Sequence, residues 1–178
     1  MTTPTNLATE LRTLDQSSPL VELFTVDCTG LGGSIYHFTP NVDVTGAAVT
    51  FRGITYQPLP VQTSGWELSV SDTQPRPTLT VSNVSGYFMS AVQTLGDIVN
   101  AKVMRVRTFY KFLDGQPTAD RNAFIDPVDV YWVYQKTAQN KNLISWQLAT
   151  PAEAFALKLP ARQFLKDFGF PGLSRIRI

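Results

Sequence analysis

The side chains that could perform chemistry are few in this sequence and widely spaced. His37 is the only histidine and Cys28 the only cysteine among 178 residues. A catalytic imidazole or a nucleophilic thiolate needs a positioned partner, and one residue of each type excludes a multi-histidine metal site and an internal disulfide. We therefore expect His37 to be an ordinary strand residue and Cys28 to be a small buried apolar residue.

Four aspartates occupy one stretch of the chain and raise the question of a calcium site. They are Asp114, Asp120, Asp126 and Asp129. The calcium loop of a helix–loop–helix site has acids at fixed, close positions, and this stretch does not. Turn and strand-entry roles are the simpler interpretation, and we expect no metal or other cofactor. The sequence leaves open a pair of remote carboxylates suited to glycoside hydrolysis, because a fold can bring distant acids together.

Other candidate groups point to structure or to binding. Ser64-Gly65 lacks the glycine before the serine that a nucleophile elbow requires, so we interpret it as a turn. Trp66, Trp132 and Trp146 support an alternative function, a carbohydrate-binding β-sandwich, because partly exposed indoles stack on sugar rings. Wholly buried indoles would leave no such platform.

One basic stripe is the most distinctive charged feature. The stretch 103–113 alternates as a single strand, which places Arg105, Arg107 and Lys111 on one face. Like charges on one strand face repel unless that face is wet or meets an acidic partner. The stripe is therefore interpreted either as a solvated sheet face or as a contact surface.

Composition limits the class of protein. The net charge is +1 with 16% charged residues, which gives no global field for nucleic acid. No apolar run reaches the roughly 18 residues that cross a bilayer, so we expect no membrane insertion. The length favours one sizeable domain.

The elements that must position these residues are mostly strands. Val49-Thr50-Phe51 and Ile54-Thr55-Tyr56 flank Arg52-Gly53, which predicts a tight hairpin. Pro58 and Pro60 predict a bend or a sheet edge, because proline has no N–H for a central ladder. Further strands are predicted at 21–26, 35–38, 78–82, 103–113, 128–134 and 144–148. Short helices are predicted at 85–96 and from the capping box at Thr150. The expected fold is all-β, a mostly antiparallel β-barrel of about eight or nine strands, closing its own edges.

The two ends of the chain predict docking segments. Leu7, Leu11 and Leu14 recur at helical spacing, which indicates an amphipathic N-terminal helix within 1–17 that needs a partner surface. The barrel should occupy 18–159. A C-terminal arm at 160–178 mixes basic residues with apolar ones, and the candidate docking residues in it are Phe164, Phe168 and Phe170.

An ordered series of segments resembles a known family. The series comprises 21–27 leading to Gly32-Gly33, Tyr36-His37-Phe38, Val49-Thr50 with Gly53, Tyr56-Gln57-Pro58, Ser64-Gly65-Trp66-Glu67, 76–83, Phe112-Leu113-Asp114, Ile125-Asp126-Pro127 and 149–153. Together these segments resemble the minor tail protein L family of phages with long flexible tails, over about Leu20 to Leu159.

The resemblance implies a structural, non-enzymatic component of the phage tail tip, made in the host cytoplasm and carried in the virion. It implies a β-barrel hub protein, expected as a homotrimeric ring between the distal tail protein and the central fibre or host-recognition protein. The basic stripe would then face the ring lumen, touching the tape-measure protein C-terminus or passing DNA. Longer relatives have a cysteine-rich segment that binds an iron–sulfur cluster, whereas 162–178 contains no cysteine. The cluster is therefore not carried over, and the chain is expected to be a short member.

Overall fold

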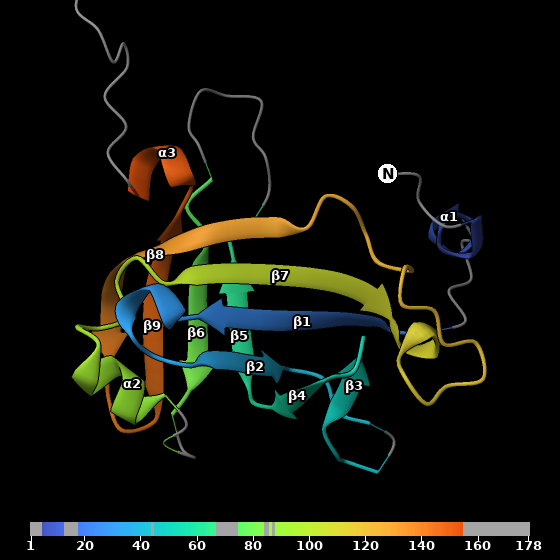
Figure 1. Cartoon of the computed structure of the whole chain (residues 1–178), viewed down its shortest axis with the longest axis horizontal. Helices are drawn as coiled ribbons and strands as arrows, with labels where there is room; N and C mark the ends of the chain where they lie inside the picture. The colour runs from blue at the N-terminus through green and yellow to red at the C-terminus, as the bar shows by residue number, and fades with distance from the viewer. Residues whose placement is uncertain are drawn as a thin grey trace, which may run out of the picture.

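One bent nine-stranded sheet forms most of the structure, which is a computed structural model (Figure 1). The structure describes residues 5–12, 18–43, 45–66, 75–83, 86 and 88–154. The strand order is β3-β4-β2-β1-β7-β8-β9-β6-β5. Among the described strands, every pairing is antiparallel except that of β2 with β4, which is parallel.

The elements follow the sequence signals closely. The strands are β1 Leu20–Asp27, β2 Ile35–Thr39, β3 Val49–Phe51, β4 Ile54–Pro58, β5 Val61–Ser64, β6 Thr78–Ser82, β7 Lys102–Phe109, β8 Asp129–Gln139 and β9 Leu143–Ala149. The helices are α1 Thr5–Arg12, α2 Met89–Thr94 and α3 Pro151–Ala154, with 3-10 turns η1 Thr29–Leu31 and η2 Tyr110–Phe112. None of the described helices is long and apolar enough to span a bilayer.

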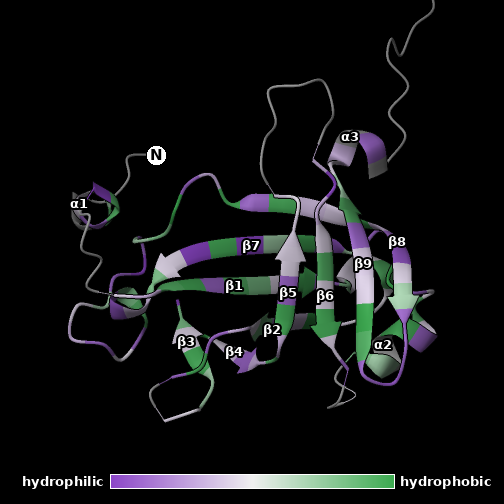
Figure 2. Cartoon of the chain, turned by 180° about the vertical axis from the view of Figure 1, so that it is seen from behind, coloured by the Kyte–Doolittle hydropathy of each residue, from purple (hydrophilic) through white to green (hydrophobic). Residues whose placement is uncertain are grey.

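The main core lies where the sheet folds over itself. Figures 1 and 2 show β5, β6 and β9 running crosswise to β1, β2 and β7. Between these two layers Phe24 stacks on Phe38 with ring centroids 5.6 Å apart, and Trp146 packs from β9. Phe88, just before α2, contacts both Phe38 and Trp146 edge-on, so the α2 region covers this end of the core. Burial of such large aromatic groups is the main stabilisation of this fold.

Two smaller clusters attach the peripheral elements. Val21 and Leu23, on the opposite face of β1 from Phe24, pack with Phe51 and Tyr56 of the β3–β4 hairpin. β1 is therefore covered on both faces. The third cluster contains Leu7 of α1 together with Phe109, Phe112 and Ala123, so the N-terminal helix docks on the end of β7.

The prediction of a closed barrel is wrong for the described residues. The sheet has two ends, β3 and β5, which do not pair with each other. Leu59 still donates its N–H to the Thr39 carbonyl at 2.9 Å, but the chain then reaches Pro60, and β2 is followed by Pro40. Because proline has no donor, the ladder stops where closure would occur. The expectation of a bend or an edge is confirmed at Pro60, which immediately precedes the edge strand β5. Pro58 is instead the last residue of β4, which lies inside the sheet between β3 and β2.

Candidate functional site

Arg105 forms the centre of a buried ion-pair cluster that joins three strands. On β7 it lies opposite Phe24 of β1 on one side and Asp129 of β8 on the other. Its guanidinium donates to the Asp129 carboxylate, with Nε and Nη2 at 2.9 Å and 2.8 Å from Oδ2, and its Nη1 lies 3.2 Å from Glu22 Oε1. The Arg105 side chain is 8% exposed. Two carboxylates thus compensate one buried cation.

Trp66 covers the same guanidinium from the end of β5. The Arg105 Cζ atom lies 4.0 Å from the centroid of the indole, which is a favourable cation–π distance. Trp66 also meets Tyr131 edge-on at 5.2 Å. The contact between Arg105 and Trp66 therefore attaches the end of the edge strand β5 to the ion-pair cluster. The cluster thus has a structural role.

The expectation of one exposed basic stripe is wrong for two of its three residues. Arg105 is buried, and Lys111 lies beyond the strand, in η2, where its ammonium pairs with Glu10 of α1. Of the three, only Arg107 is a partly exposed residue of the strand itself, since Lys111 is equally exposed but lies outside β7. The Arg107 Nη2 atom lies 3.7 Å from Asp129 Oδ2, an oxygen that Arg105 already occupies, and the Arg107 side chain is 30% exposed. Alternation along one strand does not reveal acids on neighbouring strands, which is why sequence reasoning missed them.

A polar cleft opens beside this cluster. Its volume is about 510 Å³, and its lining includes the β5 residues Thr63 and Ser64, followed by Gly65 and Trp66, on one side. Arg105, Arg107, Pro127 and Asp129 line the other side. The cleft thus places the sheet edge next to the most accessible cation of the cluster.

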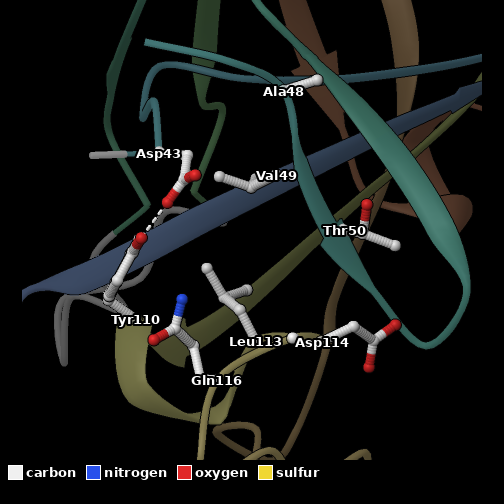
Figure 3. Close-up of a pocket in the computed structure, with 9 residues that line it drawn as sticks. Asp43, Ala48, Val49, Thr50, Tyr110, Leu113, Asp114 and Gln116 are labelled. Atoms are coloured by element: carbon white, nitrogen blue, oxygen red, sulfur yellow. Dashed lines mark hydrogen bonds between the residues drawn. The ribbon is translucent and has the colours of Figure 1, made fainter. Parts of the chain in front are cut away.

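A smaller pocket, of about 190 Å³, lies where the β3–β4 hairpin meets the segment after β7 (Figure 3). The Tyr110 hydroxyl donates to the Asp43 carboxylate in this pocket. Asp114 accepts from the Gly53 N–H at 2.6 Å, and its own N–H donates to the Thr50 carbonyl at 2.9 Å. These groups hold the hairpin against the body, so the arrangement is a structural joint.

His37 and Cys28 occupy the environments expected of packing residues. The His37 Nδ1 atom lies 3.0 Å from the Thr25 hydroxyl, and its ring meets Tyr56 edge-on. Burial lowers the pKa of His37 below its ordinary value of 6.5. Cys28 is fully buried, and burial, with a smaller contribution from the charge of Asp27, raises the pKa of its thiol to about 11. A thiol with so high a pKa is a poor nucleophile near neutral pH.

The four aspartates have separate roles. Asp114 braces the hairpin, Asp120 accepts from the Asn122 N–H at 2.9 Å, and Asp129 pairs with Arg105. Asp126 is exposed. Within the described ranges, no three residues among the histidines, cysteines and acids are grouped so that they could hold a metal ion.

The tryptophans give little support to a sugar-binding platform. Trp146 is 1% exposed, and its indole N–H donates to the Asp97 carbonyl at 3.2 Å. Trp66 and Trp132 are half-buried, and Arg105 and Tyr131 contact the ring of Trp66. None of the three indole side chains is largely exposed to solvent. The turn expected at Ser64-Gly65 agrees with a left-handed Gly65, whose φ is +77°.

The predicted docking residues lie only partly within the described residues. Leu7 is fully buried against the body, whereas Leu11 on the same helix is 45% exposed. Leu14, Phe164, Phe168 and Phe170 lie outside the described residues, as does the C-terminal arm. Their docking roles remain predictions.

These features define a class of protein, a structural β-sheet protein. Its described ion pairs mainly connect its own strands and helices, and one sheet edge with an adjoining cleft stays accessible. The family model for phage minor tail protein L matches residues 29–170. Tail tip protein L of Escherichia phage lambda is 32% identical over 156 residues, covering 85% of this chain and 67% of that protein. The chain belongs to the phage minor tail protein L family and is a homologue of a structural component of the tail tip. The family expectation from the sequence is thereby confirmed.

Proposed function

We propose that this chain forms a hub ring in a phage tail tip, joining the distal tail ring to the central fibre or host-recognition protein. The observation that carries the proposal is the family match over residues 29–170, together with 32% identity to a tail tip protein. A homotrimer is the proposed state of the ring. The proposed task is to bind and position neighbouring tail proteins rather than to catalyse a reaction.

The fold supports a load-transmitting role. Large aromatic groups fill the core between the crossed layers, and the cluster around Arg105 joins β1, β7 and β8. A close-packed interior of this kind deforms little and transmits strain between its surfaces. Helix α1 offers a further surface, because Leu11 is exposed on a helix whose Leu7 is buried.

Contact with the tape-measure C-terminus or with passing DNA remains part of the proposal, and it rests mainly on Arg107. Arg105 and Lys111 are already engaged by carboxylates of this chain. Arg107 shares its carboxylate with Arg105 and is the more accessible of the two arginines.

The proposal is tested by deleting the gene for this chain from the phage genome that encodes it. A second set of particles is produced with the chain supplied in trans. We expect particles without the chain to lack functional tails, and complementation to restore infectivity. Quantitative mass spectrometry of purified tails should then find the chain in a multiple of three copies. Infectious particles with complete tails in the absence of the chain would refute the proposed function, and a copy number not divisible by three would refute the trimer.

A further inference from the structure

Strand β5 is an edge whose outward backbone groups can be identified. Among the described strands β5 pairs with β6 alone, in the register Val61↔Val81 and Thr63↔Leu79. The Ser82 N–H donates to the Pro60 carbonyl at 2.9 Å, so this pair is of the hydrogen-bonded kind. Because such pairs alternate in an antiparallel ladder, Gln62 and Ser64 bond to β6, whereas Val61 and Thr63 turn their N–H and C=O groups away from it. No described residue bonds to these outward groups.

The edge at the other end of the sheet, strand β3, is covered by contrast. β3 has only three residues, Val49 and Phe51 are buried, and the Thr50 carbonyl accepts from the Asp114 N–H at 2.9 Å. A short edge that is covered by a loop cannot easily take another strand. Among the described strands, β5 is therefore the edge suited to strand addition.

The place beside β5 is where a ladder has been interrupted. The Leu59 N–H bonds to the Thr39 carbonyl at the end of β2. β2 stops there, before Pro40, whereas the chain after Leu59 continues into β5 without a partner strand from β2. A cleft borders each end of this edge. One of about 410 Å³ is lined by Pro40, Pro60 and Val61 together with residues of β6 and β9, and the other, of about 510 Å³, is lined by Thr63 and Ser64. This space accommodates an extended chain.

The positive charge of Arg107 beside the β5 edge favours an occupant with an acidic side chain. Arg107 lines the same cleft as Thr63 and Ser64, and the carboxylate oxygen near it is already bound by Arg105. A carboxylate that reached Arg107 would gain a charge-assisted hydrogen bond. An extended segment running along β5 would therefore favour an acidic side chain at the Trp66 end.

We propose that β5 receives an extended segment of another tail protein, which adds a strand through Val61 and Thr63 and places a carboxylate side chain on Arg107. This is strand addition to an exposed sheet edge, in which backbone bonds give affinity and side-chain sites give specificity. The inference deepens the proposed structural role and rests on it. A second copy of this chain fits less well, because neither edge strand, β5 or β3, contains an acidic residue to reach Arg107.

Proline substitution tests the edge while leaving its own ladder intact. Thr63→Pro removes an outward N–H, so we expect the melting temperature to change by no more than about 4 °C. Gln62→Pro is the matched control, because it removes an N–H that bonds to β6 and should lower the melting temperature by about 6–12 °C. In hydrogen exchange on the isolated wild-type chain, the amides of Val61 and Thr63 should exchange much faster than those of Gln62 and Ser64.

Assembly then identifies the occupant. We expect the amount of Thr63→Pro chain in purified tails to fall at least tenfold, and that of Arg107→Gln to fall less, with recovery in Arg107→Lys. A benzoylphenylalanine photo-crosslinker at Ser64 should join the chain to a different tail protein through a peptide that contains Asp or Glu. Crosslinks to a second copy, wild-type incorporation of Thr63→Pro, or slow exchange at Val61 and Thr63 in the isolated monomer would overturn the inference. Absence of the wild-type chain from tails would refute the proposed function itself, and the inference with it.

Discussion

Replacing Arg105 with alanine should destabilise this fold far more than the same change at Arg107, two residues along the strand. Arg105→Ala leaves Glu22 and Asp129 without their shared cation and removes the group that covers Trp66. Removal of one partner from a fully buried ion pair costs about 3–5 kcal/mol. Glu22 and Asp129 are 28% and 21% exposed, so water can solvate them in part. We therefore expect a loss of about 2–3 kcal/mol in the free energy of unfolding.

Arg107→Ala is the matched control. The Arg107 side chain is 30% exposed and its Nη2 lies 3.7 Å from the shared carboxylate oxygen, so its loss should cost less than about 1 kcal/mol. Arg105→Lys should fall between the two, because an ammonium keeps the charge but cannot bond both carboxylates in the fork geometry of a guanidinium. Urea denaturation of purified chains, monitored by tryptophan fluorescence, gives the comparison.

A further variant separates the effect of lost charge pairing from the effect of lost packing. Arg105→Met retains much of the side-chain volume but leaves Glu22 without its cation and Asp129 with only the more distant Arg107. Adding Glu22→Gln and Asp129→Asn removes those charges, and the combined variant should be more stable than Arg105→Met alone by at least about 1 kcal/mol. Equal losses at Arg105 and Arg107, or no gain in the combined variant, would show that the cluster behaves as an ordinary solvated surface and that our reasoning is wrong.

Three further predictions concern α1, Cys28 and His37. Leu7→Ala should cost about 2–4 kcal/mol in the stability of the docked helix and Leu11→Ala less than about 0.5 kcal/mol, measured by hydrogen exchange in α1; similar values would refute the docking of α1 through Leu7. The pKa of Cys28 is raised from 9.0 to about 11, so the protonated thiol favours the folded state and stability should fall as pH rises through this range; in Cys28→Ala, this part of the alkaline loss should vanish in denaturation curves. The pKa of His37 is lowered from 6.5, so the unfolded chain binds a proton first and stability should fall as the solution becomes more acidic than this value; His37→Gln should show a smaller acid dependence, and an unchanged one would contradict the assignment.

Elements fixed by local chemistry were predictable from the sequence. Arg52 and Gly53 have φ values of 59° and 77°, the left-handed pair that a tight two-residue hairpin requires, and the dipeptide signals it directly. In the β8–β9 hairpin the Asn140 side chain accepts from the N–H groups of Asn142 and Leu143, which a turn rich in asparagine makes plausible. Both predicted hairpins are confirmed.

Features set by remote pairing were not predictable in the same way. The parallel contact of β2 with β4 joins Phe38 to Gln57, and no local signal encodes it. The buried state of Arg105 depends on Glu22, 83 residues away, and on Asp129, 24 residues away. A charged residue on an alternating strand suggests solvent exposure until these acids are known. The sequence therefore indicated Arg107 as a candidate contact residue, a role that remains a prediction, but it did not indicate the geometry around it.

Proline placement explains both the failed closure of the sheet and the open edge beside it. Pro40 follows β2, while Pro58 and Pro60 lie where β4 leads into β5. The β2–β4 ladder continues past Pro58 through the Leu59 N–H, so the interruption falls at Pro40 and Pro60, which have no N–H to extend it. An unpaired edge is an aggregation hazard unless it is short, covered or used. The β3 edge is short and covered by a loop, whereas no described residue occupies the outward side of β5, which has no charged side chain of its own. The proposed occupation of β5 in the assembled tail would protect this edge.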